Sequence, residues 1–265
     1  MRKLAVFISL LVLFGCTKEY QDNKVVVLGH GGMGINSFYP WNSYESVFKA
    51  VNLDSDGTEM DVRMTKDSVF VLFHSEALES ETDLVGNIRD LTWDEIKDAK
   101  YGYPYLVNYS VAKLENVFKV MEGRSDKILD LEVKPFLGSN HEQYYKVFNA
   151  NLLKLISKYD VADNLIIEFN QERHLELFKQ ANSTISVVAF NTYEKALSWA
   201  IKYNCDGIVL SLDELNKTKI DAIHAAGKKV ISFNVRSYSE NRKALDLGID
   251  IIQTDNLEYL ISLVK

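Results

Sequence analysis

Short apolar runs alternate with longer stretches of helical spacing along most of the chain. There are eight such runs, at residues 25–28, 57–62, 128–133, 165–167, 185–190, 207–210, 229–233 and 249–252. Between them lie amphipathic stretches, for example at residues 171–180, 193–203, 212–226 and 239–247. Near-continuous apolar strands linked by helices pair in parallel and are buried on both faces. Eight strand–helix units in about 240 residues predict an α/β fold, a closed (β/α)8 TIM barrel.

One further apolar run interrupts this alternation after the second predicted strand. Residues 69–73 follow that strand after only Lys66, Asp67 and Ser68, which is a hairpin spacing. The next segment, residues 76–110, contains a predicted helix at 92–99 and a stretch rich in Tyr, Pro and Gly. We therefore expect a small insertion that caps the mouth of the barrel after strand 2.

The first residues have the pattern of an export signal. Arg2 and Lys3 precede an apolar stretch at residues 4–14, which is too short for a bilayer-spanning helix of roughly twenty residues. The following Gly15 and Cys16 resemble a bacterial lipobox, although an ordinary cleaved signal peptide stays open as an alternative. We expect a signal peptide at 1–15, a lipidated tether at 16–24 and a barrel domain at 25–265. The protein is then an exported lipoprotein of the bacterial cell envelope, anchored to a membrane through Cys16 on its periplasmic or outer surface.

Composition narrows the class of protein. Of the 265 residues 47% are hydrophobic, with 13 Gly, 3 Pro and 2 Cys, which excludes a disordered chain and a disulfide scaffold. The formal net charge is −7 and no basic run occurs. Because nucleic acid binding needs a basic face, we expect no nucleic acid partner.

Polar residues of the types that catalyse reactions or bind metals lie at the ends of the predicted strands. In a parallel barrel the carboxyl ends of the strands share one mouth, and residues two apart in a strand point to the same face. Two imidazoles, three carboxylates and one ammonium occur at such positions: His30, Glu59, Asp61, His74, Glu132 and Lys134. The other histidines lack this setting, and we expect a loop position for His141 and helix surfaces for His174 and His224.

Three carboxylates in one pocket predict a bound cation. Without a counter-charge, like charges in a low dielectric raise each other's pKa. Ligands that are all oxygen favour Mg²⁺ or Ca²⁺, so Glu59, Asp61 and Glu132 are candidate metal ligands. His30 and His74 then remain free for proton transfer. Together with Lys134 near the substrate anion, this set suits hydrolysis of a small-molecule phosphodiester.

The order of these motifs resembles the glycerophosphodiester phosphodiesterase family. The likeness runs from about residue 25 to the C-terminus, and residues 59–74 are its most specific part. It rests on His30-Gly31-Gly32, Asn42-Ser43, Glu59-Met60-Asp61-Val62-Arg63, His74, Leu131-Glu132-Val133-Lys134 and Gln253-Thr254-Asp255.

The resemblance implies a (β/α)8 barrel that hydrolyses glycerophosphodiesters to glycerol 3-phosphate and an alcohol, helped by the glycerol hydroxyl beside the phosphate. It implies that His30 and His74 are the acid/base pair, and that the three carboxylates hold Ca²⁺ or Mg²⁺. Lys134 matches a phosphate-contacting lysine of the family. Asn42 falls in a pocket motif, and Phe233 takes the place of a tryptophan in the pocket wall, so both are candidate substrate contacts.

Several positions depart from the family pattern. Gly31 stands where the family has a phosphate-contacting arginine, Trp41 where it has a glutamate, and Ser75 where it has an aspartate. Arg236 replaces an asparagine and is a candidate to supply a cation to the substrate from another side. Because a lost guanidinium changes phosphate recognition more than proton chemistry, two alternatives stay open. One is a phospholipase D-like hydrolase of lysophospholipid or sphingomyelin, and the other is a non-catalytic ligand-binding surface lipoprotein.

Overall fold

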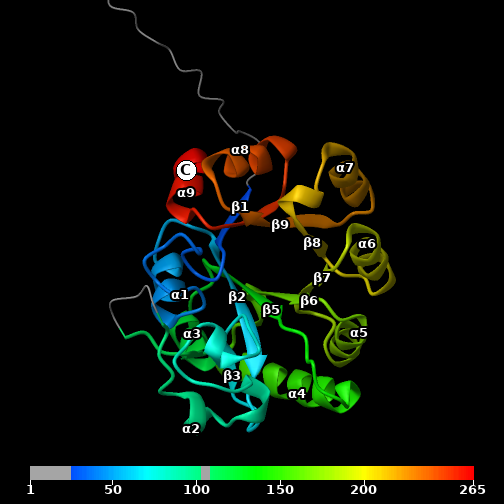
Figure 1. Ribbon diagram of the computed structural model, residues 1–265. Coiled ribbons are helices and arrows are strands. Elements are labelled where there is room, and N and C mark those ends of the chain that lie inside the picture. The colour runs from blue at the N-terminus through cyan, green and yellow to red at the C-terminus, as the bar shows by residue number, and fades with distance from the viewer. Residues whose placement is uncertain (1–24, 103–107) are drawn as a thin grey trace, which may run out of the picture.

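Eight parallel strands close a barrel in the computed structural model, which describes residues 25–102 and 108–265. They are β1 (Val26–Gly29), β2 (Gly57–Met64), β5 (Ile128–Val133), β6 (Leu165–Phe169), β7 (Ser186–Phe190), β8 (Gly207–Ser211), β9 (Lys229–Val235) and β10 (Ile251–Thr254). Their hydrogen-bonded order is β1-β10-β9-β8-β7-β6-β5-β2, and pairing of β1 with β2 closes the cylinder. The helices form a ring outside these strands (Figure 1). The predicted TIM barrel is confirmed.

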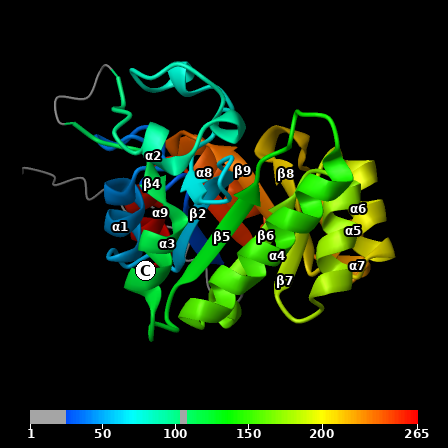
Figure 2. The ribbon, with the colours of Figure 1, turned by 90° about the horizontal axis from the view of Figure 1, so that it is seen from below.

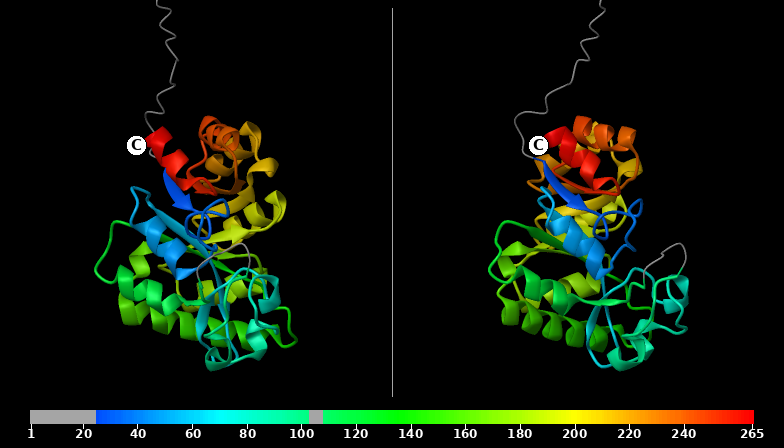
Figure 3. Two further views of the ribbon diagram at one scale, coloured as in Figure 1. Left: turned by 60° about the vertical axis from the view of Figure 1, so that its left-hand side comes forward. Right: turned by 90° about the vertical axis from the view of Figure 1, so that its left-hand side faces the viewer.

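The outer ring is made of helices that follow the strands in sequence. They are α1 (Tyr44–Val51), α3 (Leu114–Met121), α4 (His141–Tyr159), α5 (Glu172–Ala181), α6 (Tyr193–Lys202), α7 (Lys217–Ala225), α8 (Tyr238–Leu247) and α9 (Leu257–Val264). Local signals set several ends: Ser237 and Glu240 form a capping box at the start of α8, and Gly248 ends it at φ 77°. The C-terminal α9 packs beside β1 (Figure 3).

The predicted insertion after strand 2 is present. β3 (Phe70–Leu72) runs antiparallel to β2, and β4 (Ala112–Lys113) runs antiparallel to β3. Between β3 and β4 lie η1 (Leu78–Ser80), η2 (Ile88–Asp90) and α2 (Trp93–Ile96), and this segment projects beyond the ring of helices at one end (Figure 2). The insertion has its own apolar cluster, which includes Phe73, Leu78 and Ile96. We call the described part of this segment, residues 74–102 and 108–111, the cap.

Two apolar layers hold the barrel. The larger fills the space between strands and helices and includes Met60 and Val62 of β2. The smaller fills the inside of the cylinder with one residue from each of six strands, namely Leu28, Ile166, Val188, Val209, Ile231 and Ile251. Alternation along each strand therefore separates a helix-facing side from a side that faces the barrel axis.

Some sequence-based expectations differ from the structure. The segment predicted as one helix at 212–226 is divided into η4 (Leu212–Glu214) and α7, since Asn216 caps α7 through Lys219 N. The helix expected at 92–99 is the single turn of α2. His174 is not on a surface: it is 2% exposed, because α5 turns it toward Asn149 of α4 at 2.8 Å. His141 is the first residue of α4, and η3 (Ala162–Asn164) precedes β6.

The expected signal peptide at 1–15, the lipidated Cys16 and the tether at 16–24 lie outside the described residues. Among the residues that are described, no helix is both long enough and apolar enough to cross a membrane.

Candidate active site

Three acidic side chains converge at the carboxyl ends of two neighbouring strands. Glu59 and Asp61 come from β2, and Glu132 comes from β5, where it is the register partner of Asp61. One oxygen of each carboxylate lies within 4.8 Å of the others. Glu59 and Asp61 are 2% exposed. The period of two that places Glu59 and Asp61 on one face also turns Met60 toward the helices, as expected.

Lys134 neutralises part of this negative charge. Its Nζ lies 2.7 Å from Asp61 Oδ1 and 2.8 Å from Glu132 Oε1. The Lys134 ammonium lowers the pKa of Asp61 against the opposing effect of burial. In Glu132, burial raises the pKa and the ammonium only partly offsets that rise. One cation among three carboxylates leaves an excess of two negative charges if all four groups are ionised.

Asn42 fixes the position of Asp61. Its Nδ2 donates to Asp61 Oδ2 at 2.5 Å, and its Oδ1 accepts from the Asp61 backbone N–H at 2.8 Å. The residue is fully buried and has a positive φ of 61°, a conformation that asparagine tolerates better than most residues. Both polar atoms of this candidate substrate contact are therefore engaged with a candidate metal ligand.

The two carboxylate oxygens of Glu59 have different environments. Its Oε2 accepts the backbone N–H of Gly31 at 2.8 Å, while its Oε1 is buried and has no hydrogen-bond partner among the described residues. Burial, followed by the charge of Asp61, raises the Glu59 pKa well above its ordinary value. An unsatisfied carboxylate oxygen beside two other carboxylates is what a hard cation would satisfy.

His30 is paired with a buried carboxylate. It follows β1, and its Nδ1 lies 2.9 Å from Oδ1 of Asp255, which follows β10. Burial alone would lower the His30 pKa, but the hydrogen bond to Asp255 and the charges of Glu59, Asp255 and Asp61 outweigh it and raise the pKa to about 9. The imidazole is thus protonated at neutral pH.

His74 has a different environment. Burial lowers its pKa, and the cations Lys134 and Arg63 add to this effect, while Asp61 opposes it. The ring stacks on Trp41 with centroids 4.6 Å apart, and Trp41 also meets His30 edge-on at 6.0 Å. The two imidazoles thus flank one indole, and their environments shift their pKa values in opposite directions.

The other candidate substrate contacts lie on β9 and just after it. Phe233 packs against Phe190 at 5.2 Å and faces His30 at 6.5 Å, so it lines the same mouth. Arg236 is 58% exposed, with Nη2 donating to Asn234 Oδ1 at 2.8 Å and Nε 3.7 Å from Asp255 Oδ2. Its guanidinium is the most exposed member of the predicted set.

The structure adds two groups that we did not predict. Asp255 orients His30, although its place at the end of an apolar strand run was a usable signal. Glu81 of the cap accepts the indole N–H of Trp41 at 2.8 Å, and nothing in its sequence context indicates this. Deeper in the barrel, Gln253 donates to Asp130 at 3.1 Å and to Glu168 at 2.6 Å.

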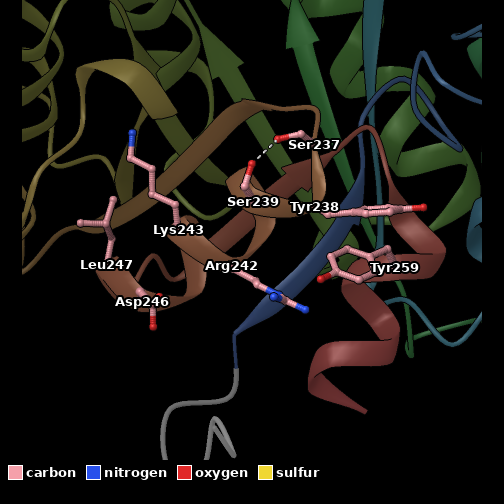
Figure 4. A pocket seen from close by; sticks show the side chains of 8 residues that line it. All are labelled: Ser237, Tyr238, Ser239, Arg242, Lys243, Asp246, Leu247 and Tyr259. Atoms are coloured by element: carbon pink, nitrogen blue, oxygen red, sulfur yellow. Dashed lines mark hydrogen bonds between the residues drawn. The ribbon is translucent and has the colours of Figure 1, made fainter. Parts of the chain in front are cut away.

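One hollow on the outer surface lies away from these residues. An open depression of about 900 Å³ lies along α8 and beside Tyr259, where the rings of Tyr238 and Tyr259 are tilted against each other with centroids 4.2 Å apart (Figure 4). None of the candidate site residues lines it. The chemistry-bearing residues gather at the mouth instead, as the fold requires of a barrel enzyme.

Comparison with known proteins gives a consistent result. The model of the glycerophosphoryl diester phosphodiesterase family matches residues 33–259. Proteins named glycerophosphodiester phosphodiesterase from Caldanaerobacter subterraneus and Bacillus altitudinis are each 24% identical to the chain. The matches cover 91% and 84% of this chain, and 98% and 91% of those proteins.

Solved structures share the barrel. An Oleispira antarctica phosphodiesterase in complex with the product sn-glycerol-3-phosphate is 21% identical with a TM-score of 0.79, over 90% of this chain and 96% of that one. A glycerophosphodiester phosphodiesterase from Parabacteroides distasonis is 18% identical with a TM-score of 0.79, over 92% and 98%.

Proposed function

Because the chain belongs to the glycerophosphoryl diester phosphodiesterase family and is thus a phosphoric diester hydrolase, we propose that it cleaves glycerophosphodiesters to glycerol 3-phosphate and an alcohol. The observation that carries this proposal is the placement of His30 and His74 on one indole beside three converging carboxylates, with the pKa of His30 raised and that of His74 lowered. Two titratable groups whose environments push their pKa values apart are the usual arrangement of an acid and a base.

The carboxylate cluster fits a divalent cation. With all three carboxylates ionised beside Lys134, the excess of two negative charges matches one such ion, and the unsatisfied Glu59 Oε1 offers a ligand atom. Glu59, Asp61 and Glu132 would hold it, and oxygen ligands favour Ca²⁺ or Mg²⁺. When bound, the ion supplies a Lewis acid that stabilises negative charge on the phosphoryl oxygens. Lys134 remains beside Asp61 and Glu132 as a fixed positive charge facing the same phosphate.

The histidines move the protons. Neutral His74 accepts the proton of the glycerol hydroxyl next to the phosphate as that oxygen attacks phosphorus. Protonated His30 donates its proton to the alcohol oxygen as the bond from phosphorus to that oxygen breaks. Water then opens the resulting cyclic phosphate with the two roles reversed, which restores both protonation states and releases glycerol 3-phosphate.

Other residues shape the pocket. Phe233 forms an apolar wall beside His30, and exposed Arg236 supplies a positive charge at the rim, where Gly31 has no side chain to do so. Asn42 acts through Asp61, because both of its polar atoms are already bound there. We also propose export and lipid anchoring at Cys16, which the N-terminal sequence pattern supports.

A substrate panel tests the proposal. The chelated chain is supplied with Ca²⁺ or Mg²⁺ and offered glycerophosphocholine, glycerophosphoethanolamine, glycerophosphoglycerol and lysophosphatidylcholine. We expect release of glycerol 3-phosphate from the glycerophosphodiesters, no turnover in EDTA, and recovery when the metal is restored. Choline release from lysophosphatidylcholine without cleavage of glycerophosphocholine would favour the phospholipase D-like alternative.

Substitution of each histidine tests its proposed role in proton transfer. His30→Ala or His74→Ala should each lower kcat by at least about a hundredfold, the usual contribution of acid–base catalysis. His224→Ala is the matched control, since His224 pairs with Asp250 outside the site at 2.8 Å. Equal losses in all three variants would show that the assignment of His30 and His74 is wrong.

A further inference from the structure

The ring of His74 is not oriented by a hydrogen bond from any described residue. A general base of this kind is normally held by a partner on its second nitrogen, as Asp255 holds His30. Within residues 25–102 and 108–265, no side chain hydrogen-bonds the His74 imidazole. Only its backbone is fixed in this way, since Arg63 Nε and Nη2 donate to the His74 carbonyl oxygen at 3.1 and 2.8 Å.

Trp41 takes the place of that missing partner. The indole stacks on His74 at an interplanar angle of 28°, which fixes the plane of the imidazole without a hydrogen bond to its nitrogens. The indole is held in turn, because its Nε1–H donates to Glu81 Oε2 at 2.8 Å. Glu81 is the residue that ends η1, so the cap supplies the group that orients the indole.

Gly31, which has no side chain, leaves room for the side chain of Trp41. A Cβ at position 31 would lie 3.0 Å from Trp41 Cβ, and Gly31 has a positive φ of 56°. A side chain at Gly31 and the indole of Trp41 therefore compete for one space. Burial raises the pKa of the Glu81 carboxyl, and the hydrogen bond from the Trp41 indole partly offsets that rise. Two positions that depart from the family pattern, Gly31 and Trp41, thus lie against each other.

We propose that Trp41 and Glu81 are positioning residues, in which the Glu81 carboxylate holds the indole and the indole holds the His74 ring in line for proton transfer. The inference rests on the proposed function for its kinetic consequence. The placement of the ring itself does not depend on turnover. We call Trp41 and Glu81 the Trp41 clamp.

Kinetics of clamp variants in the full chain test the proposal. Trp41→Leu should lower kcat by about tenfold or more while KM changes less than about twofold, because the effect is on orientation and not on substrate binding. Trp41→Phe keeps an aromatic face and should retain most of kcat. Glu81→Ala should lower kcat severalfold, and Glu81→Gln should restore it, since the amide oxygen still accepts the indole N–H. The double variant Trp41→Leu/Glu81→Ala should be no slower than Trp41→Leu alone.

Glu79→Ala is the matched control. Glu79 lies two residues from Glu81 on η1, is exposed, and bonds only the Gly86 N–H at 2.9 Å among the described residues. It should leave kcat and KM unchanged. If Trp41→Leu fails to fold, the contrast between Glu81→Ala and Glu81→Gln decides, because the Glu81 side chain is only partly buried.

A spectroscopic measurement separates this inference from the proposed function. In the metal-free chain, the ring protons of His74 should resonate upfield because they lie over the indole, and Trp41→Leu should abolish this shift. Unchanged His74 resonances, an effect on KM alone, or additive losses in the double variant would each overturn the clamp. A chain that cleaves no glycerophosphodiester but shows the shift would overturn the proposed function and retain the ring placement.

Discussion

The two histidines of the site show how one residue type obtains two roles from its neighbours. His30 donates to a buried carboxylate, whereas His74 stacks on an indole and lies near two cations. The raised pKa of His30 makes the stability of the folded chain depend on pH. A His30 pKa raised to about 9 adds stability that is fully present below its unfolded value, near 6.5, and is lost as pH rises through 9. At alkaline pH, both the free energy of unfolding and kcat/KM should therefore fall as His30 loses its proton.

Asp255→Asn tests this dependence. The amide can still accept the His30 Nδ1–H, so the ring stays in place, but the charge that favours the imidazolium is gone. Burial then dominates, and we expect the His30 pKa to fall by at least about one unit. The alkaline limb of the kcat/KM profile should move to lower pH by the same amount, measured alongside an NMR titration of His30.

Asp250→Asn is the control for that substitution. Asp250 also pairs with a histidine, His224, but at the start of β10 and not at its end. The same change there should leave the alkaline limb in place. A limb that stays fixed in Asp255→Asn would exclude His30 as the group that must be protonated.

At the scale of the element, the two faces of strand β2 carry different residues: the proposed catalytic carboxylates on one and core residues on the other. Glu59 and Asp61 face the barrel mouth, while Met60 and Val62 between and beside them are buried against the helices. This division follows from the two-residue period alone, which is why the sequence predicts the convergence of the carboxylates. Helix α5 shows the limit of such patterns. Its polar His174 turns inward because a partner on α4 satisfies it, and that pairing depends on how two helices pack.

Opposite substitutions on β2 should separate the two functions of the strand. Met60→Ala leaves a cavity in the core and should lower the free energy of unfolding by about 2–5 kcal/mol, with kcat/KM of the folded chain unchanged. Glu59→Gln should abolish activity and leave stability equal or higher, because it removes a buried charge that its neighbours destabilise. Urea unfolding and kinetics on both variants check this. Loss of activity in Met60→Ala below its unfolding transition would contradict it.

For the whole molecule, closure of the barrel explains how much of the site could be foreseen. The apolar runs identify the strands, and the rule that parallel strands share one mouth brings His30, Glu59, Asp61 and Glu132 together. Loops and the cap follow no such rule. Glu81 reaches Trp41 because of the path of η1. The conformation of these segments depends on contacts with the finished barrel, so no local pattern reports it.

The direction of β1 also bears on how an anchored molecule would meet its substrate. The described chain enters β1 at its amino end, and His30 follows the carboxyl end of β1, so a tether before residue 25 would join the barrel at the end opposite the mouth. Nine residues, 16–24, reach about 30 Å at most. We therefore expect the mouth to face water and to accept soluble glycerophosphodiesters rather than lipids of the anchoring bilayer.

Membrane fractionation tests this expectation. In cells of an expression host with lipoprotein processing, the wild-type chain should pellet with membranes and Cys16→Ser should not. The two forms should have equal kcat/KM on glycerophosphocholine. Cys205→Ser is the control, since that thiol is buried and should leave the partition unchanged. A soluble wild-type chain would contradict the anchoring, and cleavage of lysophosphatidylcholine in vesicles only by the anchored form would contradict this orientation.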